Sequence, residues 1–174
     1  MQSNEALAAF RTYASEKMEQ NLAQVMRCAA ILNVDQMWRR ENERCNAVGN
    51  LILHLTGNIR QWAVSGLGGE KTERDRPAEF SRREPLEHSR LVPHFEHTVR
   101  RAIDIVRELS DEKLAREVNI QGYAIRSIVA VFHIVEHLSF HTGQIVHITK
   151  SILNVDLSLY DSQGQRLDAN RGRP

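Results

Sequence analysis

The apolar positions of this chain recur every three or four residues in four long segments, which predicts four amphipathic helices and very little strand. The first segment carries Leu7, Phe10, Ala14, Met18, Leu22, Val25, Ala29 and Leu32. The third repeats Val92, Phe95, Val99, Ala102, Val106 and Leu109. We expect the second helix to begin near Asn46, a good N-cap residue, and to end by Gly66. The fourth should run from about Ile125 to Leu153.

The connections between these segments differ in character. Residues 66–83 are rich in glycine and mixed charge, and a link of this length in a compact domain is usually functional or mobile. It could form a lid, a dimer contact or a mobile solvated loop. Ser110 could begin one short helical turn, and residues 118–123 suggest an extended link that turns at Gly122. Pro93 either kinks the third helix or marks its first turn.

Four such helices predict an all-α fold, a four-helix bundle with a long connection between its second and third helices. That connection can cross one end of the bundle, so these two helices need not be antiparallel neighbours. We expect one domain over residues 1–153. Residues 154–174 are more polar, and we expect a loosely ordered C-terminal tail there.

Composition excludes several classes of function. The chain has 174 residues, 41% hydrophobic and 26% charged, with a formal net charge of +1. That balance gives no reason to expect nucleic acid or a membrane surface as a partner. No apolar run approaches the length of a membrane span, and no signal peptide is visible. Cys28 and Cys45 form no metal or redox motif. Together with the missing signal peptide and membrane span, this favours a cytoplasmic protein.

Three histidines, His133, His137 and His141, follow one another at intervals of four inside the fourth apolar segment. Residues four apart lie one above the other on a helix, so two neighbouring imidazoles can share a metal ion. His133 and His141 are roughly 12 Å apart along the axis, so one ion cannot take all three. On a helical wheel, His137 and His141 share one stripe with Gln144, whereas His133 lies further round.

A third ligand is available on the second helix. His54 is surrounded by aliphatic residues, where an unpaired imidazole is costly. With His137 and His141 it would give three neutral imidazoles and leave coordination positions open to water or substrate. The alternative is that these are ordinary buried histidines bound to core polar groups. Asn58, one turn after His54, and Gln144 could orient a ligand or a bound water, or simply cap helix carbonyls.

Other metal motifs fit less well. His133 to His137 matches the inverted zinc-protease pattern H-x-x-E-H, but Glu136 points away from the stripe of His137 and His141. A ferritin-like di-iron centre needs Glu-x-x-His, which does not occur in the chain. The remaining histidines lie in charged surroundings or off the stripe, and we expect them to be solvated: His88, His94, His97 and His147.

The spaced combination of motifs resembles the DinB-like superfamily of small bacterial four-helix bundles, over roughly residues 5–153. It consists of His54-Leu-Thr-Gly-Asn58, then Gly69-Glu-Lys, Arg74-Asp-Arg76 and Glu79-Phe80, then His137-x-x-x-His141-x-Gly-Gln-Ile145. The resemblance implies one divalent metal ion on His54, His137 and His141. Zinc or nickel would suit the site best, and iron or manganese would also fit.

The same resemblance implies two kinds of chemistry, since relatives include metal-dependent thiol S-transferases and hydrolases. The expected partner is therefore a small-molecule substrate, in particular a low-molecular-weight thiol, and the expected assembly is a homodimer. The alternative is a non-catalytic stress-response or binding module. Such a module would dimerise through an exposed helix face, with its metal structural or absent.

Overall fold

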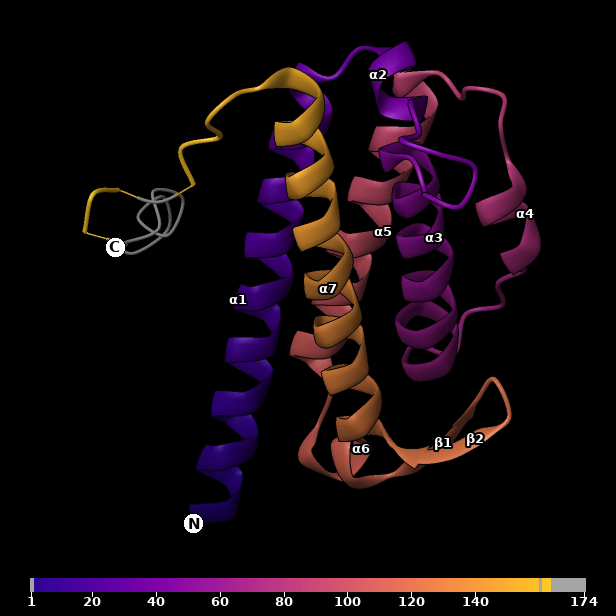
Figure 1. Ribbon diagram of the computed structural model, residues 1–174. Helices are drawn as coiled ribbons and strands as arrows, with labels where there is room; N and C mark the ends of the chain where they lie inside the picture. Colours follow the sequence, from indigo (N-terminus) through magenta and orange to yellow (C-terminus); the bar gives the residue numbers. More distant parts are fainter. Residues whose placement is uncertain (1, 160, 164–174) are drawn as a thin grey trace.

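The four predicted apolar segments form four long helices that lie side by side (Figure 1). They are α1 (Gln2–Ile31), α3 (Val48–Ile59), α5 (His88–Glu108) and α7 (Ser127–Leu153). The computed structural model describes residues 2–159 and 161–163. Within these residues α1 packs against α5 and α7, and α3 packs against the same two helices. The predicted all-α class is confirmed, with one small hairpin as the described exception.

The core lies where these helices face one another, because each buries its apolar stripe there. On α7 the stripe is completely buried and consists of Ala130, Val131, Ile134, Leu138 and Ile145. Phe95 and Val99 of α5 are equally buried. Each large aliphatic or aromatic side chain in such a position contributes roughly 1.5–3 kcal/mol. The helix that carries two of the three candidate ligands is therefore held firmly in place.

None of the helices in the described part of the chain is long and apolar enough to span a membrane.

The second predicted helix differs from expectation at both ends. Its N-cap is Ala47, not Asn46, and the side chain of Asn50 accepts a bond from the Ala47 amide at 3.4 Å. At the other end the helix does not stop before Gly66 but continues as a π-helical segment, η1 (Arg60–Leu67). Gly66 is needed there for a close approach, since a β-carbon would overlap the side chain of Ile120. π-Helical turns are found frequently at functional sites.

A hairpin precedes the fourth helix, which therefore begins later than predicted. Strands β1 (Glu117–Ile120) and β2 (Tyr123–Arg126) pair antiparallel, with Val118 opposite Ile125. Gln121 and Gly122 both have positive φ, 56° and 82°, as a tight two-residue hairpin turn requires. The predicted turn at Gly122 is thus confirmed, but Ile125 belongs to β2 and α7 begins at Ser127.

Two short helices, α2 and α6, connect the long ones. The capping box of Asn33 and Gln36 begins α2 (Val34–Trp38), in a stretch whose polar sequence suggested no helix. Ser110 caps α6 (Asp111–Ala115), which confirms the predicted short turn. Pro93 lies inside α5, beyond its first turn.

The long connection after η1 is folded against α3. It contains α4 (Arg76–Ser81), whose N-cap Asp75 accepts a hydrogen bond from the amide of Ala78 at 3.1 Å. α4 lies along the outer side of α3 (Figure 1) and is in contact with it. The connection is therefore part of the protein wall beside α3, and not a loop surrounded by solvent.

The predicted tail lies partly outside the described residues. Of the part that the structure describes, Leu157 is 3% exposed and belongs to the hydrophobic core. The backbone oxygen of Ser158 accepts a hydrogen bond from Arg27 at 3.3 Å. The first residues after α7 thus pack back onto α1.

Two glycines inside helices provide a test of this packing. A β-carbon at Gly49 of α3 would lie 2.6 Å from Cε2 of Trp38, whereas one at Gly143 of α7 would meet nothing within 4 Å. We predict that Gly49→Ala lowers the free energy of unfolding by about 1–3 kcal/mol. Gly143→Ala should raise it by about 0.5–1 kcal/mol. Urea titration measures both, and an equal effect at the two positions would contradict the Trp38–α3 contact.

Candidate metal site

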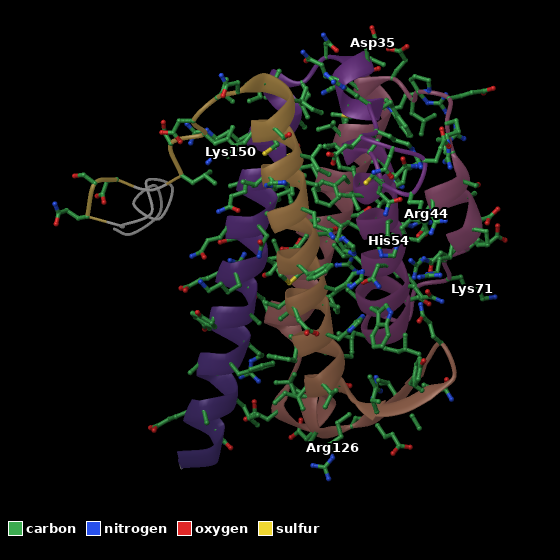
Figure 2. All side chains as sticks on the ribbon, viewed as in Figure 1. Asp35, Arg44, His54, Lys71, Arg126 and Lys150 are labelled. Carbon is green, nitrogen blue, oxygen red and sulfur yellow. The ribbon has the colours of Figure 1, made fainter. Side chains whose placement is uncertain are left out.

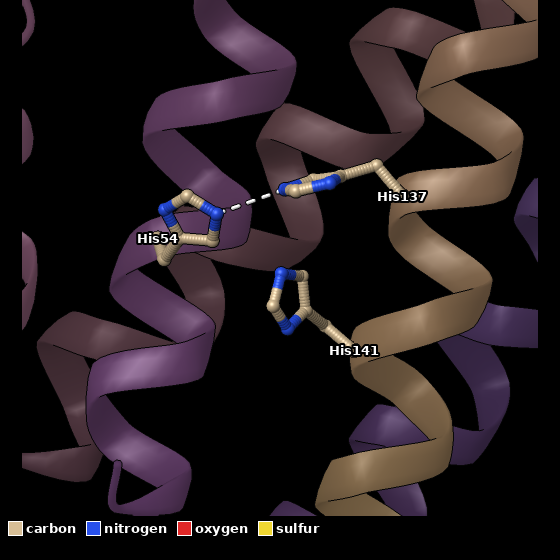
Figure 3. Close-up of side chains that lie close together, drawn as sticks. All are labelled: His54, His137 and His141. Carbon is tan, nitrogen blue, oxygen red and sulfur yellow. Dashed lines mark hydrogen bonds between the residues drawn. The ribbon is translucent and has the colours of Figure 1, made fainter. Parts of the chain in front are cut away.

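Three histidines from two helices converge between α3 and α7 (Figure 3). His54 comes from α3, and His137 and His141 come from successive turns of α7. Each offers one ring nitrogen, and these nitrogens all lie within 4.8 Å of one another. The Nε2 atoms of His54 and His137 are 2.8 Å apart. His54 lies in the interior, among the helices, as Figure 2 shows.

The ring of His54 is held from behind by a buried carboxylate. Nδ1 of His54 lies 2.9 Å from Oε2 of Glu79, and the two residues are 4% and 8% exposed. An ionised carboxylate only accepts hydrogen bonds, so Nδ1 carries the proton and Nε2 presents its lone pair to the cluster. Phe80 adds a ring contact on the same imidazole, with 4.5 Å between centroids.

Arg74 holds that carboxylate in its charged form. Its Nε donates to Oε1 of Glu79 at 2.7 Å and its Nη2 donates to Oε2 at 2.9 Å. Burial raises the pKa of Glu79, but the hydrogen bonds from Arg74 and His54 outweigh burial and leave that pKa below its usual range. Nη2 of Arg74 also lies 3.3 Å from Nδ1 of His54, but the carboxylate is the nearer partner of that nitrogen.

His141 is oriented in the same way by an amide from its own helix. Nδ1 of His141 lies 2.7 Å from Oε1 of Gln144, three residues further along α7. The amide oxygen accepts the Nδ1 proton, and Nε2 is left with its lone pair. Two of the three imidazoles are thus fixed as the same tautomer by an acceptor behind the ring. Ligand histidines usually donate their second ring nitrogen in this manner.

The surroundings of His137 and His141 favour the neutral imidazole, which is the form that binds metal. Burial lowers the pKa of His137 to about 3, with further lowering from the nearby His141, His54 and His133 and from Arg74. Burial also lowers the pKa of His141, although the hydrogen bond with Gln144 opposes the shift. Nε2 of His137 lies 2.8 Å from Nε2 of His54 (Figure 3). Because Nε2 of His54 carries no proton, Nε2 of His137 is the donor of this hydrogen bond. A metal ion would take the place of that proton.

The donor set fits a divalent transition-metal ion. Metal–nitrogen bonds of about 2.0–2.1 Å place the ligand atoms of a tetrahedral site about 3.4 Å apart. The nitrogens of the three histidines already lie within 4.8 Å, so binding needs only small side-chain shifts. The carboxylate of Glu79 lies behind His54 and contributes charge without being a ligand. Three protein ligands leave at least one position for a small molecule.

The other histidines lie outside this cluster, with two differences from expectation. Nε2 of His88 is 2.6 Å from the carbonyl oxygen of Ala29, so His88 is not merely solvated. His133 is half-buried. Its ring is tilted against that of Trp62, with centroids 4.0 Å apart, and stacks on that of His137, at 5.3 Å. Glu136 is exposed, away from the histidine cluster. His94, His97 and His147 are exposed.

Sequence reasoning missed the residues behind His54. Arg74 and Glu79 occur in the motifs that resemble DinB-like proteins, but no role was assigned to them. Gln61 extends their network, since its Oε1 accepts from Nη1 of Arg74 at 2.8 Å and from Nε2 of Gln121 in the hairpin turn. Asn58 makes no side-chain hydrogen bond with the histidines in the described chain. It is 5% exposed, and its Oδ1 has no hydrogen-bond partner there.

Comparison with known proteins agrees with this description. Residues 5–160 match the family described as "Protein of unknown function (DUF1572)". No curated protein matches the sequence. A DinB-like protein from Bacillus subtilis has a similar structure, with a TM-score of 0.65 at 14% identity, over 88% of this chain and 99% of that one. A DinB-like protein from Bacillus cereus gives 0.63 at 14% identity, over 82% and 89%.

A third similar structure, a conserved protein from Enterococcus faecalis, has a TM-score of 0.68 at 13% identity, over 83% of this chain and 97% of that one. At these identities the likeness concerns the fold. The chain therefore has the DinB-like fold that its motifs suggested.

The neutral state of His137 has a consequence for stability. Its pKa is about 3 in the folded protein and about 6.5 in the unfolded chain, so the unfolded chain binds more protons between these values. We predict that the metal-free protein, in excess chelator, loses on the order of 2 kcal/mol of unfolding free energy between pH 7 and pH 4. Urea titrations across this range should show a shallower loss for His137→Gln. The exposed His147→Gln is the control, and an unchanged slope in His137→Gln would contradict the prediction.

Proposed function

This chain belongs to a family of proteins of unknown function, and we propose that it is a divalent-metal-dependent enzyme that transfers a small thiol or hydrolyses a small substrate. One observation carries the proposal: two buried imidazoles and one half-buried imidazole converge, and two of the three are fixed from behind with their Nε2 lone pairs turned toward the cluster. Ordinary core histidines do not need two such arrangements beside a third imidazole at one point.

The chemistry follows from the donor set. A divalent ion on three neutral imidazoles lowers the pKa of a thiol or water bound beside them, which supplies a nucleophile at neutral pH. The residues of the chain hold the ligands and exclude solvent. Glu79 and Arg74 fix the ring of His54, and Gln144 fixes that of His141. Zinc or nickel suits three imidazoles best, and iron or manganese also fits.

The choice of a thiol rests on the resemblance to DinB-like proteins, some of which transfer small thiols. The geometry is compatible with it, since the candidate site has open positions and the cluster borders a pocket that contains no competing cysteine. We propose the same site for hydrolysis, because a bound water would need the same three ligands and the same neutral surroundings.

Metal binding is the first test. We predict that protein purified without a histidine tag binds one equivalent of zinc or nickel, measured by elemental analysis and competition with a chromogenic chelator. His54→Ala and His141→Ala should abolish stoichiometric binding. Glu79→Ala should weaken it by about 10–100-fold, because His54 loses the acceptor that fixes its tautomer.

His133→Ala is the matched control, because it removes a histidine of the same helix that lies outside the cluster. Its affinity should stay that of the wild type. Unchanged affinity in His141→Ala, with loss in His133→Ala, would instead assign the ion to the pair His133 and His137. Circular dichroism of each metal-free variant separates loss of a ligand from loss of the fold.

Turnover is the second test. With 1-chloro-2,4-dinitrobenzene as acceptor and a panel of thiols that includes cysteine and glutathione, we predict metal-dependent formation of the thioether. The sulfur displaces chloride from the aromatic carbon, and the thiol proton passes to solvent. 4-Nitrophenyl acetate tests hydrolysis in parallel. Activity should disappear with chelator and in His141→Ala, and its absence for every pair would contradict an enzymatic role.

A second candidate function is a non-catalytic binding module that dimerises. One observation favours it: Phe132 and Phe140 on α7 are 61% and 63% exposed, which is unusual for side chains of this size. In this alternative the histidines bind metal only structurally. Stoichiometric metal without turnover, together with a dimer in solution, would favour this module over the enzyme.

A further inference from the structure

A pocket of about 420 Å³ opens beside the histidine cluster. It reaches His54 and His137 on one side and is closed by the hairpin on the other, where Gln121, Tyr123 and Ile125 line it. Its volume lies in the range of small-molecule sites. The only part of the cluster missing from its wall is His141. A molecule in the pocket therefore lies next to the place where a metal would be held.

The charged groups of the pocket are all positive. Among the described residues the wall contains Arg74 and Arg76 but no aspartate or glutamate. The charge of Arg74 is balanced by Glu79 behind it. Arg76 is exposed, and no ion pair involves it in the described chain. Its guanidinium lies over the ring of Phe80, 5.2 Å from the centroid, and the same ring contacts His54.

Part of the wall, on the side of the hairpin and the start of α7, is apolar and accessible. Tyr123 and Val129 are 61% and 50% exposed, and they belong to the few large apolar residues with so much exposed surface. Both line the pocket, together with Ile125. Such surface at the mouth of a cavity offers contact to the apolar body of a ligand.

The inner wall lacks hydrogen-bond partners. Five buried side-chain polar atoms have none in the described chain, and three of them belong to this wall: Asn58 Oδ1, Trp62 Nε1 and His133 Nε2. Asn58 and Trp62 are 5% and 6% exposed. An unpaired buried polar atom is destabilising. Solvent does not reach these atoms, and a ligand would pair with them after a small shift of the Trp62 and His133 rings, which are in contact with each other.

From these observations we infer that the pocket binds the acceptor substrate, and that this substrate is a small apolar carboxylate. Its anionic group lies at Arg76, its body lies against Tyr123, Ile125 and Val129, and its inner end lies at Asn58, Trp62 and His137. The inference rests on the proposed function only for the claim that the bound carboxylate is the acceptor in a metal-dependent reaction. Binding of the carboxylate itself needs no metal.

The test is a titration followed by nitrogen–proton correlation spectra of the full chain. The probes are 4-phenylbutanoate, hexanoate and indole-3-propanoate, each compared with its neutral amide. The indole N–H signal of Trp62, assigned with Trp62→Phe, reports binding inside the pocket. Each titration is done with metal-loaded protein and in excess chelator.

We expect at least one carboxylate to bind more tightly than its amide and to move the Trp62 signal, with and without metal. Arg76→Gln should weaken this binding by about tenfold, the value of one charge-assisted hydrogen bond, and should leave the amide unaffected. Lys71→Gln is the control, since it removes a positive charge from the same connection that projects outward and away from the pocket (Figure 2). Tyr123→Ala should weaken carboxylate and amide alike.

Three results would overturn the inference: no carboxylate binds more tightly than its amide, Arg76→Gln binds as the wild type does, or binding disappears with chelator. The last would mean that the carboxylate binds the metal directly. If the protein bound no metal at all, the proposed enzymatic function would fail, and the titration in chelator would still decide whether the pocket takes an apolar carboxylate.

Discussion

The buried carboxylate of Glu79 must be paired, because an isolated charge in the interior costs several kcal/mol. Its two oxygens face Arg74 and His54, and this requirement organises much of the surrounding structure. Arg74 must turn inward from the connection, which brings α4 against α3. His54 must offer the proton on Nδ1, which leaves Nε2 for the cluster. One ion pair therefore places a segment of chain and selects the tautomer of a candidate ligand.

The same pairing explains why the candidate site draws on so many elements. α3 and α7 supply the three imidazoles, and the connection supplies the acceptor behind one of them. Through Gln61, the network extends from Arg74 to Gln121 in the hairpin turn. The hairpin also closes the adjoining pocket. The positions of the ligands, the pocket wall and the hairpin are thus linked by hydrogen bonds as well as by packing.

Much of this structure could be predicted from the sequence because its cause is local. Apolar spacing alone located the four long helices, and the wheel placed His137 and His141 on one stripe. The aliphatic neighbours of His54 suggested an inward imidazole. Helix ends were less predictable, since the start of α3 depends on the side chain of Asn50 and the start of α7 on strand pairing at Ile125.

The roles of Arg74 and Glu79 could not be predicted in this way. Glu79 lies 25 residues from His54, in a segment whose mixed charge is typical of a solvated surface. Only the tertiary contact of this segment with α3 buries the charges of Arg74 and Glu79 and pairs them. The available signals were indirect: Asp75 and Pro77 mark the start of a short helix, and a histidine among aliphatic residues requires some polar partner.

Gly57 shows how far this constraint extends. It belongs to α3 and faces the carboxylate, so a β-carbon there would overlap Glu79 and lie 3.0 Å from Nε of Arg74. The residues at 57, 74 and 79 therefore cannot vary independently. Among related chains, a residue other than glycine at position 57 should occur together with a shorter acid, or no acid, at position 79. Covariation of these three positions would then distinguish relatives that keep this support of the histidine from those that orient it by other means.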